Sequence, residues 1–304
     1  MKKTKVVVIG VGAVGSTTAY TLLLRSRMDE LVLIDANAGK AVGDVLDMNH
    51  GLPFLGQTKV WAGTYEDCKD ADIVIITAGA AQKPGEPRLN LLKRNVAIYE
   101  SIVSEVLKYN DDGILLIATN PVDIMSYFCW QKSGWPARRV IGSGTLLDSA
   151  RFRYLIGERL QLDPRSVHAH IIGEHGDSEL PVWSLANVAG SPLTLSEEEK
   201  SDIFAHTRDA AYEIIEAKGA TYYAIALALD RIVTAILRNE SAVLNVSTLV
   251  EQYHGLSGVY MGVPCVVDRQ GVREVLDIPI TEEERALLHR SANKLQELIE
   301  TISV

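Results

Sequence analysis

Short runs of β-branched and aliphatic residues alternate with segments of helical spacing along the first half of the chain. This alternation is typical of βαβ units, in which helices cover both faces of a buried parallel sheet. We therefore predict an α/β fold that begins with a doubly wound parallel sheet. The predicted strands are Lys5–Ile9, Leu31–Ile34, Thr58–Trp61, Ile73–Thr77, Ile114–Ala118 and Arg139–Ile141.

The second half of the chain is less regular, which predicts an α+β domain. A domain boundary is expected after Gly142, dividing the chain into residues 1–142 and 143–304. A helix is expected over Leu146–Leu160, followed by an apolar stretch at Val167–Ile172. A long helical pattern covers Ile203–Leu237, where Gly219 predicts a kink. Capping boxes at Ser196 with Glu199 and at Thr281 with Glu284 predict two helix starts.

Composition narrows the class of protein. The 304 residues are 47% hydrophobic and carry a net charge of −9, which favours a packed globular protein and argues against a nucleic-acid binder. No segment reaches the roughly 18 continuous apolar residues of a membrane-spanning helix, so no membrane partner is expected. Cys68, Cys129 and Cys265 have neither metal-ligand nor redox spacing, so we expect no metal and a cytoplasmic location.

A glycine-rich motif lies between the first predicted strand and the next helix. Gly10, Gly12 and Gly15 form Gly-x-Gly-x-x-Gly, which allows a tight turn, close approach of a pyrophosphate and close helix packing. The helix N-terminus after the turn favours phosphate groups. Asp35 ends the second strand, twenty residues after Gly15, where a carboxylate accepts from ribose hydroxyls and repels a 2′-phosphate. The motif predicts a Rossmann domain that binds NAD rather than NADP.

Three charged side chains in the second half predict the chemistry. His175 lies between Gly173-Glu174 and Gly176-Asp177, directly after an apolar strand. Asp148 and Arg151 are three residues apart on one helix face. Asp148 could orient the imidazole of His175, while Arg151 could pair with a substrate carboxylate.

A polar loop rich in proline and glycine runs from Gln82 to Arg88, after the strand that ends near Thr77. The carboxyl edge of an open parallel sheet is where ligands bind. The loop is therefore predicted to be a lid that brings Arg88 into the site when it closes.

In their order along the chain, these motifs, together with the segment from Ala118 to Asp123, resemble the lactate/malate dehydrogenase family, and within it the bacterial L-lactate dehydrogenases. The resemblance implies that His175 donates and accepts the proton and that Asp148 orients it. It also implies that Arg151 binds the carboxylate of pyruvate or lactate and Arg88 polarises the carbonyl. The substrate-binding residues implied are Gln82, Arg88, Asn120, Arg151 and Thr221. The cofactor-binding residues expected are Gly10, Gly12, Val14, Gly15, Asp35, Lys40, Tyr65, Gly79, Ala80, Thr119, Asn120 and Ser143.

The choice of substrate depends mainly on Gln82. Malate dehydrogenases of the family have an arginine at this place, and a neutral Gln82 would leave the second carboxylate of oxaloacetate buried without a partner. Pyruvate is therefore favoured, with a malate or broad-specificity L-2-hydroxyacid dehydrogenase as the alternative. Pro87 departs from the serine or threonine that usually precedes the lid arginine, and it restricts the loop. A NAD-dependent glycosidase and a catalytically silent NAD sensor fit the residues less well.

The resemblance also implies a regulatory site. Arg153 lies about 200° around the helix from Arg151 and so faces away from the substrate. In the bacterial enzymes the matching arginine, together with a histidine at the place of His168, binds fructose 1,6-bisphosphate across a subunit interface. We therefore expect this effector and a homotetramer.

Overall fold

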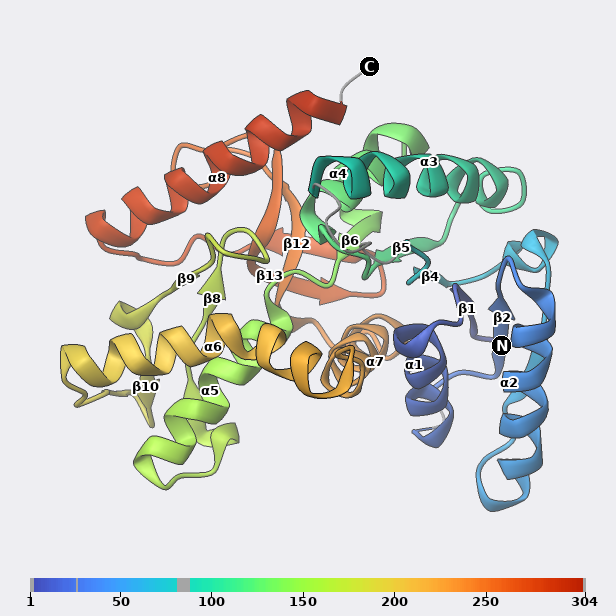
Figure 1. Ribbon diagram of the computed structural model, residues 1–304, viewed down its shortest axis with the longest axis horizontal. Helices are drawn as coiled ribbons and strands as arrows, with labels where there is room; N and C mark the ends of the chain where they lie inside the picture. Colours follow the sequence, from blue (N-terminus) through green and yellow to red (C-terminus); the bar gives the residue numbers. More distant parts are fainter. Residues whose placement is uncertain (1–2, 26, 81–87, 303–304) are drawn as a thin grey trace.

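The computed structural model describes residues 3–25, 27–80 and 88–302. These residues form a nine-stranded sheet with helices packed around it and two smaller sheets at one end (Figure 1). The first half of the chain lies at one end of the molecule, and the segment from α5 to α6 lies at the other. None of the helices formed by these residues is long and apolar enough to cross a membrane.

All six predicted strands of the first half form, and their ends shift by no more than one residue. They pair in parallel in the order β6-β5-β4-β1-β2-β3, which is the doubly wound arrangement expected of a Rossmann domain. The predicted fold class is therefore confirmed. The strands are β1 (Lys5–Ile9), β2 (Glu30–Ile34), β3 (Lys59–Ala62), β4 (Ile73–Ile76), β5 (Ile114–Ile117) and β6 (Val140–Gly142).

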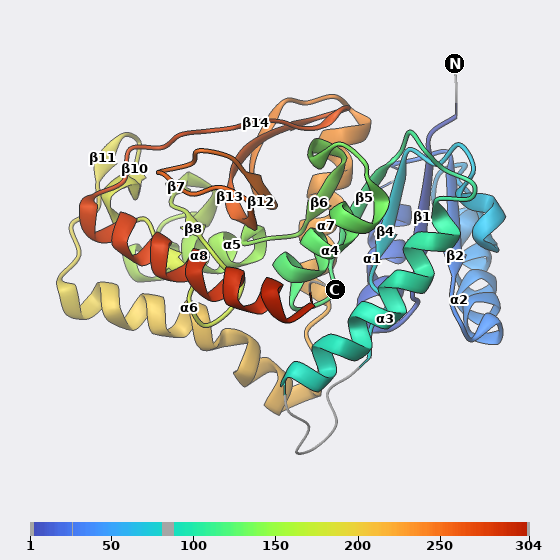
Figure 2. The same cartoon turned by 90° about the horizontal axis from the view of Figure 1, so that it is seen from above.

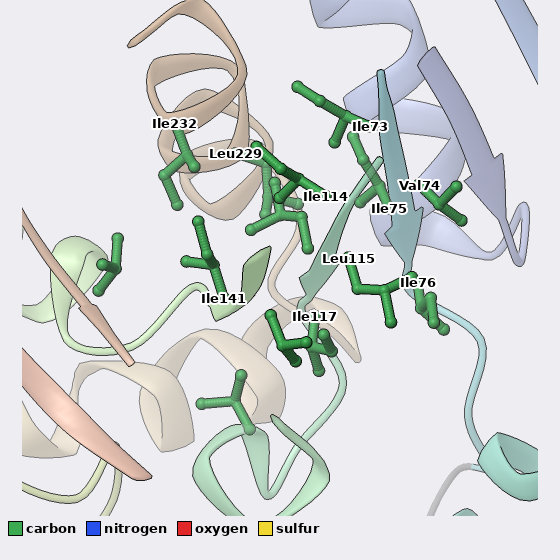
Figure 3. Close-up of a cluster of buried hydrophobic side chains, with 14 of the residues drawn as sticks. Ile73, Val74, Ile75, Ile76, Ile114, Leu115, Ile117, Ile141, Leu229 and Ile232 are labelled. Atoms are coloured by element: carbon green, nitrogen blue, oxygen red, sulfur yellow. The ribbon is translucent and has the colours of Figure 1, made fainter. Parts of the chain in front are cut away.

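Helices cover both faces of this parallel sheet, and α3 and α4 lie on the opposite side from α1 (Figure 1). One of the covering helices, α7, comes from the second half of the chain and packs against α1. Figure 3 shows Leu229 and Ile232 of α7 beside Ile114 and Ile141 of the central strands. The helices of the first half are α1 (Ala13–Leu24), α2 (Ala38–Gly51), α3 (Arg88–Val106) and α4 (Val122–Ser133).

Three antiparallel strands of the second half extend the same sheet beyond β6. The junction is the pair Ser247 and Gly142, which joins β12 to β6. A Cβ on Gly142 would lie 2.8 Å from Cβ of Ser247, so the close approach of these strands requires glycine. The sequence patterns did not predict this continuous sheet. Its added strands are β12 (Ala242–Val250), β13 (Val259–Asp268) and β14 (Gly271–Val275).

The long helical pattern of the second half is two helices rather than one kinked helix. Gly219 has a φ of +85° and ends the first helix, and the next begins at Tyr223. The expectation of a kink was wrong because a residue in this left-handed conformation terminates a helix. In Figure 2, α8 crosses the second half and its C-terminal end lies near α4. The helices are α5 (Leu146–Leu160), α6 (Glu197–Lys218), α7 (Tyr223–Leu237) and α8 (Glu282–Ile302).

Both capping boxes form as predicted. The Ser196 hydroxyl accepts from the backbone N–H of Glu199, whose carboxylate accepts from the N–H of Ser196. Thr281 and Glu284 make the same two bonds ahead of α8. The predicted apolar stretch contributes to two small sheets. Their strands are β7 (Val167–His168), β8 (Ile171–Ile172), β9 (Leu180–Pro181), β10 (Asn187–Val188) and β11 (Ser191–Pro192).

Candidate active site

The glycine-rich turn follows β1 and leads directly into α1. Gly10 has a φ of +95°, and a Cβ at this position would lie 2.5 Å from the backbone of Ala78. A Cβ on Gly15 would overlap the carbonyl oxygen of Gly10. Gly12, in contrast, precedes α1 with nothing within 4 Å of its Cβ position. The open space beside Gly12 lets a phosphate group approach the free N–H groups of the helix N-terminus.

Asp35 lies just past the end of β2, next to this turn. Its Oδ2 accepts from the N–H of Val11 at 2.7 Å, and its Oδ1 accepts from the N–H of Asn37 at 2.8 Å. These bonds hold the carboxylate where a doubly wound sheet binds the adenosine ribose. Lys40 is exposed in the first turn of α2, and Tyr65 is half-buried after β3.

The loops after β4 and β5 are tied together by Asn95 of α3, which is 1% exposed. Its Oδ1 accepts from the N–H of Ala80 at 2.8 Å, and its Nδ2 donates to the carbonyl of Asn120 at 3.2 Å. Sequence reasoning assigned no role to Asn95, because its partners are 15 and 25 residues away along the chain. The other predicted cofactor residues near these strand ends are Val14, Gly79, Thr119 and Ser143.

The loop after β8 carries His175, whose side chain meets those of Asp148 and Arg151 from α5. Asp148 Oδ2 lies 2.6 Å from His175 Nδ1, and Asp148 Oδ1 accepts from Arg151 Nη1 at 2.8 Å. Asp148 is 1% exposed, whereas the side chains of His175 and Arg151 are 22% and 14% exposed. Nε2 of His175 and the remaining N–H groups of Arg151 are thus the atoms available to a ligand.

The contacts between Asp148, His175 and Arg151 determine the protonation states of His175 and Asp148. Burial opposes the charged form of His175, but the Asp148 carboxylate outweighs burial and raises the pKa of the imidazole to about 9. Burial also opposes charge on Asp148, yet His175 and Arg151 hold the pKa of that carboxyl below its usual value. At neutral pH a carboxylate therefore lies beside a protonated imidazole. Such an imidazole can donate a proton to a ligand oxygen.

Asp123 of α4 fixes the backbone of His175 from the other half of the chain. Its Oδ2 accepts from the N–H of His175 at 2.7 Å, and its Oδ1 accepts from the hydroxyl of Ser247 at 2.6 Å. The residue is 2% exposed, and burial raises its pKa to about 6. The sequence motif contains Asp123, but no role was predicted for it. Its two partners lie 52 and 124 residues away.

A second carboxyl group near the pair was also missed. Glu179, four residues after His175, is 7% exposed. One of its carboxylate oxygens lies within 4.8 Å of ligand atoms of both Asp148 and His175. The segment from His175 to Glu179 is a loop and not a helix, so the four-residue spacing does not by itself indicate this approach.

The remaining substrate residues are placed only in part. Asn120 is exposed after β5 and precedes Pro121 in a cis peptide bond, and Thr221 is half-buried between α6 and α7. The backbone of Arg88 begins α3, but its side chain and the whole of Gln82 lie outside the described residues. The predicted lid from Gln82 to Pro87 is not tested for the same reason.

Arg151 and Arg153, two of the arginines of α5, have different hydrogen-bond partners. Arg151 bonds to Asp148, whereas Arg153 Nε donates to the carbonyl of Ser149 at 3.2 Å. Burial lowers the pKa of His170 and outweighs its hydrogen bond with Asn245, and the nearby Arg153 and His168 lower the pKa further. Arg153 and His168 thus lie near one another, together with a third basic side chain that the sequence analysis did not name.

Comparison with known families agrees with this geometry. Residues 4–142 match the NAD binding domain of lactate/malate dehydrogenase, and residues 145–303 match the alpha/beta C-terminal domain of the same family. The chain belongs to the lactate/malate dehydrogenase family. It is therefore an NAD-dependent oxidoreductase, which confirms the NAD cofactor predicted from the glycine-rich turn and Asp35 and the activity implied by the family resemblance.

Individual members of the family are similar over nearly the whole chain. An L-lactate dehydrogenase of Acetivibrio thermocellus is 52% identical over 99% of this chain and 98% of its own. One from Halalkalibacterium halodurans is 54% identical over 98% of this chain and 97% of its own. The crystal structure of the minor L-lactate dehydrogenase from Enterococcus mundtii in the ligands-bound form has a TM-score of 0.97, with 46% identity and 99% of both chains covered.

Proposed function

We propose that this oxidoreductase catalyses the reversible reduction of pyruvate to L-lactate. The observation that carries the proposal is that one buried carboxylate, that of Asp148, bonds to both His175 and Arg151. A proton donor and a carboxylate receptor are thus fixed relative to each other. A 2-oxo acid needs this pair, because it presents a carbonyl and a carboxylate on adjacent carbons.

The chain's own side chains divide the work of the reaction. Arg151 binds the substrate carboxylate, and His175 donates the proton from Nε2 as the carbonyl oxygen becomes a hydroxyl. NADH supplies the hydride when bound. In the reverse direction His175 accepts the proton, and Asp148 stabilises the imidazolium. By resemblance, Arg88 polarises the carbonyl, while Asn120 and Thr221 line the pocket.

We propose that the expected cofactor contacts hold the dinucleotide along the carboxyl ends of β1, β2, β4 and β5. The open space at Gly12 fits a pyrophosphate, and the fixed carboxylate of Asp35 fits a ribose without a 2′-phosphate. The further contacts proposed for the dinucleotide are Lys40, Tyr65 and Ser143. We further propose that residues 1–142 form the cofactor domain and 143–304 the catalytic domain. The place where the two family matches meet supports this division.

The substrate test is a comparison of kcat/KM for NADH oxidation with pyruvate, oxaloacetate and a branched 2-oxo acid. We expect pyruvate to be preferred over oxaloacetate by about 100-fold or more, because an unpaired buried carboxylate costs several kcal/mol. A Gln82→Arg variant should shift this preference towards oxaloacetate. A preference of the natural protein for oxaloacetate would refute pyruvate reduction as its function.

We also propose that fructose 1,6-bisphosphate is an effector. Arg153, His168 and His170 lie near one another and form what we call the basic cluster, in which Arg153 supplies the positive charge for a strongly anionic ligand such as a sugar bisphosphate. Binding at an interface between subunits would relieve repulsion between the cations of neighbouring chains.

We propose that the protein is a homotetramer in the cytoplasm. A cavity of about 750 Å³ beside α1, α2 and the start of α7 is lined by apolar side chains, including Tyr20, Leu24 and Phe54, and by polar ones, including Asp44 and Asp47. Phe54 is 88% exposed and Tyr223 is 66% exposed beside it, and an apolar surface of this kind is typical of a contact between subunits. The three cysteines are free and buried, which suits a reducing compartment.

A further inference from the structure

Glu179 is a buried carboxyl group whose Oε1 has no hydrogen-bond partner among the described residues. It lies directly before β9, at the end of the loop that carries His175. A carboxylate oxygen of Glu179 comes within 4.8 Å of both the Asp148 carboxylate and the His175 imidazole. The proposed proton transfer involves Asp148 and His175 but does not require Glu179.

The groups that face Glu179 come from three parts of the fold. Asp148 and Arg151 face it from α5, His175 faces it from its own loop, and Arg208 faces it from α6. Arg208 is already paired with Asp209, whose Oδ1 accepts from its Nε at 2.8 Å. Arg151 and His175 are both bonded to Asp148. Among the described residues, none of these three cations donates a hydrogen bond to Glu179 Oε1.

An unpaired carboxylate in such a place is unfavourable, since burial removes its hydration and a second carboxylate repels it. Burial and then the charge of Asp148 raise the pKa of Glu179 to about 9. At neutral pH Glu179 is consequently a neutral carboxylic acid. Asp148, bonded to His175 and Arg151, and Asp123, bonded to the His175 backbone, are then the ionised carboxylates beside His175, and an ionised Glu179 would add a further negative charge.

We propose that Glu179 sets the charge of the substrate site: protonated, it adds no charge beside His175 and Arg151, and ionised, it adds a negative charge that repels the carboxylate of the 2-oxo acid. This proposal rests on the proposed function, because the repelled group is the carboxylate of the proposed substrate. Glu179 is a positioning residue in this account, since it acts through the charges of its neighbours. Substrate binding should then require two protons in the site, one on His175 and one on Glu179.

The test is to count protons taken up when oxamate, which has the carboxylate of pyruvate but is not reduced, binds the enzyme with NADH. Titration calorimetry in buffers of different ionisation enthalpy gives this number. The measurement is made at about pH 9.5, above the pKa of about 9 of both His175 and Glu179, so that both groups are mostly deprotonated before oxamate binds. We expect more than one proton per site in the natural protein. Glu179→Gln should take up no more than one, because its amide mimics the neutral acid and does not titrate.

Glu198→Gln is the matched control, because it makes the same substitution at an exposed position of α6. It should behave as the natural protein does. Uptake of one proton or fewer by the natural protein would overturn the proposal, whether or not Glu179→Gln folds. Equal uptake in the natural protein and Glu179→Gln would overturn it as well.

Two further measurements separate this proposal from the proposed function. Pyruvate reduction by Glu179→Gln at pH 7 should stay within about threefold of the natural rate, whereas a loss of 100-fold would show that an ionised Glu179 is needed. Infrared spectra at pH 7 should show the carbonyl band of a neutral carboxyl that disappears in Glu179→Gln. If pyruvate is not reduced at all, the proposed function fails, and the infrared band still decides the protonation of Glu179.

Discussion

At the scale of single residues, the active site is organised by one buried carboxylate with two cationic partners. The pKa of His175 is raised to about 9, above its ordinary value near 6.5. A group with a raised pKa in the folded state stabilises the fold fully below its unfolded value. The His175–Asp148 pair thus contributes its full stabilisation below about pH 6.5 and loses it as the pH rises through about 9.

The residues predicted from sequence share a property that those missed lack. His175, Asp148 and Arg151 lie in short motifs whose local spacing signals chemistry. Glu179 and Asn95 act through contacts that depend on how distant segments pack, and no local pattern reports such contacts. The sequence thus indicated the three side chains that meet at Asp148, whereas Glu179 and Asn95 could be found only in the structure.

At the scale of elements, local signals placed helices and strands well where the chain itself fixes their ends. The helix over Leu146–Leu160 forms with the predicted bounds, and both capping boxes are present. The pattern over Ile203–Leu237 was misinterpreted as one helix, because apolar periodicity continues across Gly219 while the backbone there turns left-handed. The antiparallel strands β12 to β14 join the parallel sheet through a tertiary contact that periodicity does not contain.

Asp123 joins three elements, so its loss should affect activity as well as stability. In Asp123→Asn one carboxylate acceptor becomes an N–H donor that faces either the His175 N–H or the Ser247 hydroxyl. We expect the free energy of unfolding to fall by about 1–3 kcal/mol. We expect kcat/KM for pyruvate to fall by about 10- to 100-fold, because His175 moves relative to the substrate.

Chemical denaturation and steady-state kinetics of the same preparation check this prediction. Ser247→Ala is the control, since it removes one donor but leaves the bond to His175, and it should cost about 1 kcal/mol with little change in rate. Natural kcat/KM in Asp123→Asn would show that Asp123 does not position His175.

At the scale of the whole molecule, one sheet runs through both halves of the chain, and both halves supply residues of the candidate active site. Asp123 comes from the first half, whereas Asp148, Arg151 and His175 come from the second. The alternating pattern of the first half predicted the doubly wound sheet. The net charge of −9 did not predict the anionic ligands, because the helix N-terminus and single arginines supply positive charge locally.

The basic cluster predicts a response of the whole assembly. Fructose 1,6-bisphosphate should raise the activity of the natural protein at low pyruvate and increase its mass in solution towards a tetramer. Arg153→Ala should abolish both responses and leave the basal rate within about threefold, because Arg153 points away from Asp148.

Rate measurements and light scattering with and without the bisphosphate check this. Arg165→Ala is the control, because Arg165 is an exposed arginine paired with Asp163. Unchanged responses in Arg153→Ala would refute the effector site.

The pH dependence of pyruvate reduction in the natural protein and in Asp148→Asn tests the catalytic arrangement most directly. If Asp148 holds the proton on His175, kcat/KM of the natural protein declines around pH 9. In Asp148→Asn the decline should move at least one pH unit lower, towards the ordinary histidine value near 6.5, with a rate loss of about 100-fold or more at pH 7. A decline at the same pH in both proteins would contradict the account.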